Sequence, residues 1–224
     1  MPSTDTIYSS EEDGYIAVSG ANWALIREAS SGTHAHTSTS FPYAVRGSVS
    51  SGRGGTTYFI TRSFFLFDTS GITHVPKSAN LYIWGSTNGN SDMRLVKSTQ
   101  GDNLADGDFD AIYGLDWSAV DASDGSGGGD ISSFVTLYDT EAIFTWATGA
   151  IANTITLNQQ ALIDIAGLDT FKCALLDSPN DIRDITPTSA TNYSGVFYTD
   201  GGSAKAPRIV VINQDDSIMF GANF

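Results

Sequence analysis

The chain has 224 residues, a formal net charge of −14 and a single cysteine, and only 16% of its residues are charged. Its length suits one large β domain, since sandwiches and barrels often run to ~200–250 residues as a single unit. One cysteine excludes a disulfide framework within the chain. The negative charge argues against binding to nucleic acid, because phosphate backbones would be repelled.

Short runs rich in β-branched and aromatic residues predict strands, and the many Gly, Ser, Asn and Asp residues between them predict turns. The predicted strands cover 15–19, 24–28, 43–48, 56–67, 80–84, 92–97, 134–138, 154–157, 170–176, 195–199 and 207–213. Short strands at this spacing predict an all-β, jelly-roll-like antiparallel sandwich. Cys173 lies inside one of these apolar runs, so we expect it to be a buried small hydrophobic residue.

Two segments have helical character. Asn158 is a suitable N-cap for a helix over 159–166, and Gly167 stands where that helix would stop. A weaker apolar pattern predicts a second helix within 139–148. Residues 100–133 show little periodicity and indicate a long acidic loop insertion. We therefore expect one sandwich domain over 14–213, between an N-terminal arm at 1–13 and a C-terminal tail at 214–224.

The first residues lack the basic start and the apolar stretch of a secretory signal. No apolar run approaches the ~20 residues of a membrane span, so membrane insertion is not expected. A β protein without a leader reaches the outside most simply inside a virus particle that is released by lysis. The expected location is therefore the virion, with a secreted or cell-surface protein as the alternative.

One strand–turn–strand unit and the closing strand resemble the DNRLRE-type β-sandwich family, a jelly-roll group akin to carbohydrate-binding modules. The matching residues are Arg62-Ser-Phe-Phe-Leu-Phe-Asp68, Ser70, Ile72, Ala79-Asn-Leu-Tyr-Ile83 and Ala206-Pro-Arg-Ile-Val-Val-Ile212. These are mainly core and turn residues, so the resemblance informs fold more than function. Arg62 and Asp68 are expected to be structural partners at a corner of the sandwich. Members of this family occur as surface, cell-wall and bacteriophage-associated modules.

No Lys or Arg stands between Lys97 and Lys172, whereas the same stretch holds twelve acids. Within it, alternating acids in a glycine-containing loop predict a Ca²⁺ site, because Ca²⁺ takes six to eight oxygen ligands. Its candidate ligands are Asp102, Asp106, Asp108 and Asp110. A solvated acidic loop is the alternative.

His34 and His36 share one face of an extended segment, and they form either a transition-metal pair or part of a polar loop.

Exposed aromatic rings could stack on sugars. Tyr113 and Trp117 are the glycan-binding candidates, because they lie in the irregular region rather than in a predicted strand. Trp84 ends a predicted inner strand, so we expect it to be buried. The other aromatic residues that could contribute to a sugar-stacking surface are Trp23, Trp146, Tyr8, Tyr43 and Tyr198.

No Gly-x-Ser-x-Gly elbow is followed by Asp and His in a plausible order, and acids alone do not define a glycosidase pair. An enzyme is therefore not expected.

The preferred prediction is a non-enzymatic virion structural protein, a capsid decoration, fibre or accessory module. It would form homo-oligomers and contact other virion proteins and host glycans. The apolar tail residues expected to contact a neighbouring subunit are Ile218, Met219, Phe220 and Phe224. The alternatives are a carbohydrate-binding module or adhesin, which calcium could assist, and a tail folded back over its own domain.

Overall fold

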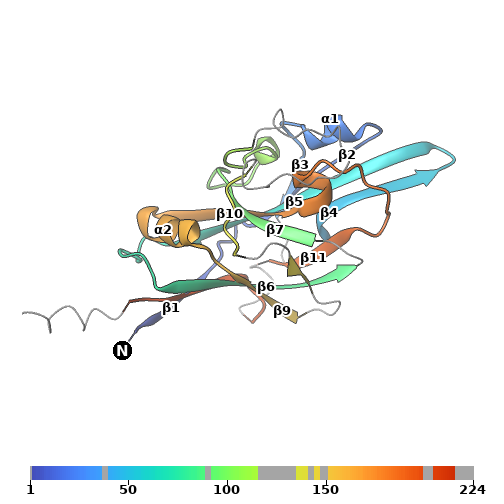
Figure 1. The fold of residues 1–224 in the computed structure, drawn as a ribbon. Helices are drawn as coiled ribbons and strands as arrows, with labels where there is room; N and C mark the ends of the chain where they lie inside the picture. The colour runs from blue at the N-terminus through green and yellow to red at the C-terminus, as the bar shows by residue number, and fades with distance from the viewer. Residues whose placement is uncertain are drawn as a thin grey trace, which may run out of the picture.

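The computed structural model describes residues 2–36, 40–88, 92–115, 135–140, 144–146, 151–198 and 204–214. These residues form an antiparallel β-sandwich with short helices (Figure 1), which confirms the predicted fold class. Hydrogen bonds link all the strands, and the two layers that face each other across the main core are called sheet A and sheet B below.

Sheet A is built around β6 (Ser78–Asn88). On one edge β6 pairs with β12 (Arg208–Ile212) and, further along, with β11 (Tyr193–Phe197). On the other edge it pairs with β9 (Ile151–Thr156). Beyond β12 lies β1 (Thr4–Tyr8), with Tyr8 opposite Arg208. The predicted N-terminal arm at 1–13 therefore differs from the structure, because residues 4–8 complete sheet A.

Sheet B is built around β5 (Gly55–Asp68), which pairs with β2 (Gly14–Gly20) on one edge and with β10 (Thr170–Asp177) on the other. Beyond β2 lies β3 (Thr33–His36). Beyond β10 lie β7 (Asp92–Lys97) and then β8 (Phe144–Thr145).

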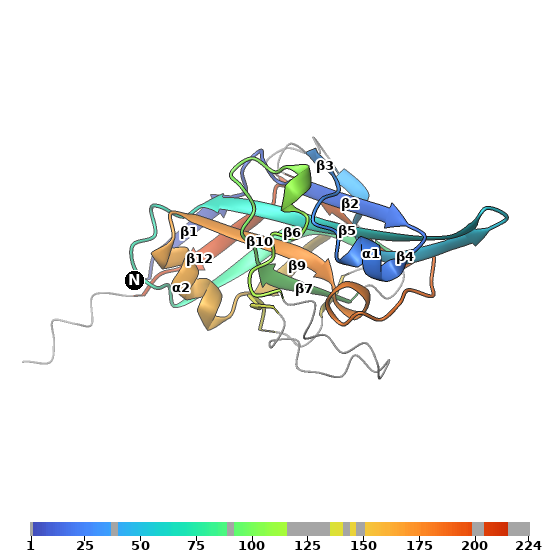
Figure 2. The ribbon, with the colours of Figure 1, turned by 90° about the horizontal axis from the view of Figure 1, so that it is seen from above.

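The strand β4 (Ser40–Gly52) joins the two sheets. Its first half pairs with β11 of sheet A, and its second half pairs with β5 of sheet B. The β4–β5 pair continues past the rest of the sandwich as a projecting hairpin, which Figures 1 and 2 show at the right.

The main core lies between the sheets, because strand residues alternate between two faces. Phe65 and Phe67 of β5 meet Leu81 and Ile83 of β6 there, and Cys173 is fully buried with them, as predicted. Burial also raises the pKa of the Cys173 thiol.

A second core covers the outer face of sheet B. Ile60 and Phe64 of β5 pack there against α1 (Trp23–Arg27) and against residues 98–115, called the η1 loop below, which carry η1 (Asp106–Asp108). Phe109, one residue past η1, is fully buried in this second core. The described part of the predicted acidic insertion is therefore a packed layer, and its aliphatic and aromatic residues hold it to the sheet.

Arg62 lies in this second core, and its prediction as a partner of Asp68 was wrong. Both Arg62 and Asp181 are fully buried, and they form an ion pair at 2.7 Å. Asp68 is exposed instead and accepts hydrogen bonds from the backbone and side chain of Ser70. Asp181 belongs to η5 (Ser178–Ile182), a single wide turn that follows β10.

The helix predictions had mixed outcomes. Asn158 caps α2 (Gln159–Gly167) by accepting from the Ala161 N–H, as expected. The strand predicted at 24–28 is instead α1, whose Asn22 cap accepts from the Leu25 N–H. The helix predicted within 139–148 is contradicted by β8, which pairs with β7.

Candidate functional site

A groove lies where β2, β4 and β5 extend beyond the edge of sheet A. Paired residues in antiparallel strands share a face, so Ser19, Ser48 and Phe59 lie on one side of the sheet. That side faces the main core further along β5, and here it is open. The cavity there measures about 370 Å³ and is lined by residues of β2, β3, β4 and β5 and by Gly32.

Aromatic rings line and flank this groove. Tyr15 stacks on Phe41 with 3.9 Å between ring centroids and an interplanar angle of 2°. Phe41 meets the edge of Tyr43 at 5.8 Å, and Tyr43 meets Tyr193 at 4.6 Å. Tyr43 is 37% exposed, so part of its ring remains available to a ligand. Burial raises the pKa of Tyr15, which keeps its hydroxyl protonated at neutral pH.

Among the described residues, Arg46 is the only charged one that lines the cavity. Its guanidinium carbon lies 4.0 Å from the Phe59 ring centroid and 4.9 Å from that of Tyr43. Its Nε donates to Ser48 Oγ at 2.5 Å. Burial lowers the Arg46 pKa, but an arginine side chain stays charged in proteins. The groove therefore holds a fixed cation between two aromatic rings.

Two other cavities have linings that are less suited to ligands. One of about 410 Å³ is bordered by Asn180 and Asn192, whose amides already donate to protein acceptors. Another of about 680 Å³ includes Trp23, which is only 5% exposed and donates its indole N–H to Asp184. The Arg46 groove combines exposed aromatic surface with a positioned charge, so we take it as the candidate site.

The structure places the four predicted calcium ligands in the η1 loop. Asp102 pairs with Lys172 at 2.8 Å, and Asp106 accepts from the backbone N–H of His34 and contacts its ring. Asp108 accepts from the N–H groups of Gly101 and Ala105, and Asp110 is exposed. Among the residues with described positions, no group of three or more His, Cys, Asp or Glu is arranged to hold a metal. The calcium site stays a prediction.

The histidine pair is only partly described. His34 contacts Asp106, and the side chain of His36 lies outside the described part. The tail residues predicted to contact a neighbouring subunit also lie outside the described residues, so this contact remains a prediction. They are Ile218, Met219, Phe220 and Phe224.

The glycan candidates had uneven outcomes. Tyr113 is 51% exposed, with Lys97 Nζ 4.8 Å from its ring centroid, whereas Trp117 lies outside the described residues. Trp23, Trp146 and Tyr198 are buried, and Tyr8 and Tyr43 are exposed. The expectation that Trp84 is buried was wrong, because it points to the outer face of sheet A and is partly exposed.

Sequence reasoning missed Arg46, Phe41 and Phe59 as members of a site. The register between β4 and β5 brings Arg46 and Phe59 together, and stacking on Tyr15 of β2 holds Phe41 in the same groove. The available signal was Phe41-Pro-Tyr-Ala-Val-Arg46, an aromatic and cationic strand ahead of a glycine-rich turn.

No protein-family model and no curated protein matches this chain. The resemblance to the DNRLRE-type family therefore stays a prediction. Over the described ranges, no helix has the length and apolar character needed to cross a membrane.

Proposed function

We propose that this chain is a non-enzymatic carbohydrate-binding module whose groove at Tyr43 and Arg46 holds a sugar chain. The observation that supports this proposal is the row of aromatic rings with a single charged residue among them. Sugar rings present apolar C–H faces that stack on aromatic rings, while their polar edges need hydrogen-bond donors. The groove supplies both kinds of contact.

Arg46 indicates the kind of sugar. A guanidinium binds carboxylates with two parallel hydrogen bonds, and no carboxylate from the described part of the chain lines this cavity. The Nε hydrogen bond to Ser48 and the contact with Phe59 hold the guanidinium in place. A sugar that carries a carboxylate, such as a uronic acid, suits this groove better than a neutral sugar.

Isothermal titration calorimetry tests the proposal. The ligands are a uronic acid oligosaccharide and a neutral oligosaccharide of equal length. We expect tighter binding of the acidic chain, and we expect Tyr43→Ala to weaken that binding at least tenfold, which corresponds to about 1.4 kcal/mol. Tyr113→Ala is the matched control, because Tyr113 is also an exposed tyrosine but lies on the η1 loop. Loss of binding in Tyr113→Ala with retention in Tyr43→Ala would move the site to the η1 loop. Absence of binding to both oligosaccharides would refute the proposal.

A second candidate function is the virion structural protein expected from the sequence, and the projecting β4–β5 hairpin favours it. Residues 50–56 at its tip are all exposed, and the hairpin extends beyond the described body (Figure 2). An arm of this kind suits contact with other proteins of a particle. Co-sedimentation of the chain with purified particles at a fixed stoichiometry would support this role, and its absence from such particles would contradict it. The two roles are compatible, because a particle surface protein can also bind host glycans.

A further inference from the structure

The outer face of sheet A differs from an ordinary solvated sheet face. Tyr8, Arg208 and Tyr82 lie in one row across β1, β12 and β6, and Arg208 lies 5.3 Å from the Tyr82 ring centroid. Next to this row, Lys205 Nζ lies 4.4 Å from the Phe197 ring centroid and 5.6 Å from that of Trp84. The face therefore presents aromatic rings capped by cations.

This face also holds no acid at its outward strand positions. Four residues identify the inward face of these strands, because they pack into the main core: Leu81 of β6, Ile155 of β9, Ile209 of β12 and Ile7 of β1. Among the described side chains, the alternate, outward residues are Thr4, Thr6, Tyr8, Ser78, Asn80, Tyr82, Trp84, Ser86, Ala152, Thr154, Thr156, Arg208, Val210 and Ile212. In a chain with 25 acids and 11 bases, a face with a base and no acid at these positions is a marked local reversal of charge.

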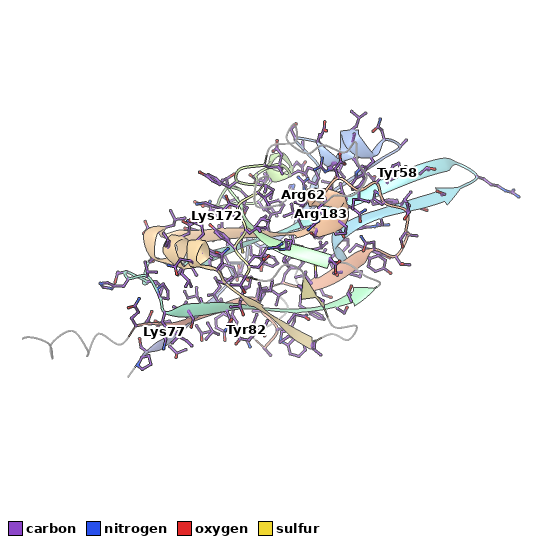
Figure 3. All side chains as sticks on the ribbon, viewed as in Figure 1. Tyr58, Arg62, Lys77, Tyr82, Lys172 and Arg183 are labelled. Carbon is purple, nitrogen blue, oxygen red and sulfur yellow. The ribbon has the colours of Figure 1, made fainter. Side chains whose placement is uncertain are left out.

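The opposite side of the molecule has the complementary charge. The η1 loop covers the outer face of sheet B and lies two layers away from the outer face of sheet A (Figure 1). It presents Asp102, Asp106 and Asp110 to solvent. Figure 3 labels Tyr82 and Lys77 on the sheet A side, away from Lys172, which pairs with Asp102 on the η1 side.

We propose that the outer face of sheet A is an interface that docks on the η1 loop of a second copy of this chain. The positive face of one copy meets the negative loop of the next, and the rings of Tyr8, Tyr82 and Trp84 supply apolar area at the centre of the contact. The two surfaces are different and lie on opposite sides of one molecule. Such a heterologous contact builds rings or filaments rather than two-fold dimers.

This inference is independent of sugar binding, because none of the residues that line the Arg46 groove is part of the proposed interface. It gives the predicted homo-oligomer a defined geometry. The charged groups of both surfaces lie at least partly in solvent, so association should weaken as salt screens them.

Sedimentation velocity of the whole chain over a range of concentrations, at low and high salt, tests the interface. We expect concentration-dependent association at low salt that declines at high salt. Arg208→Glu should raise the dissociation constant about fivefold or more, since exposed ion pairs contribute up to about 1 kcal/mol and reversal adds repulsion. Asp110→Lys in the η1 loop should have a similar effect. The double variant Arg208→Glu with Asp110→Lys should recover association, because it restores an opposite-charge pair.

Arg53→Glu is the matched control, because Arg53 is an exposed arginine at the hairpin tip and its reversal changes the net charge equally. It should leave association unchanged. Chemical unfolding of each variant shows whether the fold is intact. The proposal is overturned if the wild-type chain stays monomeric at low salt, if Arg53→Glu acts as strongly as Arg208→Glu, or if Arg208→Glu leaves association unaffected.

Discussion

Arg62 and Asp181, 119 residues apart in the chain, form a two-pronged ion pair in which Nε and Nη2 each donate to a different carboxylate oxygen at 2.7 Å. Both side chains are fully buried. Arg62 also donates to the backbone oxygens of Phe109 and Arg27. This one guanidinium therefore ties β5, η5, α1 and the η1 loop together.

Removing one partner of such a pair leaves a buried charge without its counterion, which costs about 3–5 kcal/mol. We expect Asp181→Ala to lose that much free energy of unfolding and to lower the melting temperature by about 10 °C, at 2–4 °C per kcal/mol for a domain of this size. Urea unfolding monitored by fluorescence measures the change. Asp68→Ala, at an exposed acid, is the control and should stay within about 0.5 kcal/mol of the wild type.

Asp177 should make stability depend on pH. Burial, helped by the nearby Asp181 charge, raises the pKa of Asp177 to about 8, against hydrogen bonds from Asn180 and Asn192 that lower it. The folded state therefore holds a proton that the unfolded chain releases above its ordinary pKa of 3.8. The stabilisation from this group is complete below that ordinary pKa and is lost as the pH rises to 8, by about 1.4 kcal/mol per pH unit.

The variant Asp177→Asn cannot titrate at this position, so its stability relative to wild type should improve steadily between pH 5 and pH 8. Urea titrations at several pH values measure the slope. A constant offset would report a changed hydrogen bond with Asn192, whereas the slope reports the proton. Parallel curves for the two proteins would contradict the prediction.

Gly85 has no room for a side chain. A Cβ there would lie 1.9 Å from Cζ3 of Trp146 and 2.4 Å from the backbone oxygen of Gly195. Because Trp146 is buried, Gly85→Ala should displace its ring and cost about 1–3 kcal/mol or more. Thermal unfolding checks this. Gly107→Ala is the control, since a Cβ at Gly107 would meet nothing within 4 Å.

Calcium should leave the melting temperature unchanged. Asp102, Asp106 and Asp108 already accept hydrogen bonds or ion pairs from Lys172, His34 and backbone N–H groups. A bound ion would have to displace these donors. Differential scanning calorimetry with millimolar Ca²⁺ and with a chelator decides the matter, because binding to the folded state alone raises the melting temperature. A clear rise would instead support the calcium site predicted from the acidic loop.

Local patterns predicted much of the fold. The run at 92–97 became β7 with the same bounds, and Asn158 capped α2 as expected. Both signals lie within a few neighbouring residues, where periodicity and capping operate. The segment 24–28 failed because five residues are too few to separate helical from strand periodicity.

Long-range partners were not predictable in this way. Nothing in the sequence near Arg62 indicates Asp181 rather than Asp68, because the choice depends on how η5 folds onto the second core. The Arg46 groove likewise depends on the register between β4 and β5 and on the position of β11 beside them. Aromatic residues in strands usually fill a core, whereas Tyr43 lies at the register shift between β4 and β11 and is partly exposed.

The pairing of β1 with β12 has a consequence for synthesis. Thr4 lies opposite Ile212, so roughly 200 further residues must be synthesised after β1 before its partner strand exists. At about 5–20 residues per second, that delay is on the order of 10–40 s. Strand β1 can remain unpaired in solvent during this time, because four of its five residues are exposed even in the finished sheet. A newly made chain should therefore acquire its second-core network first and close sheet A last.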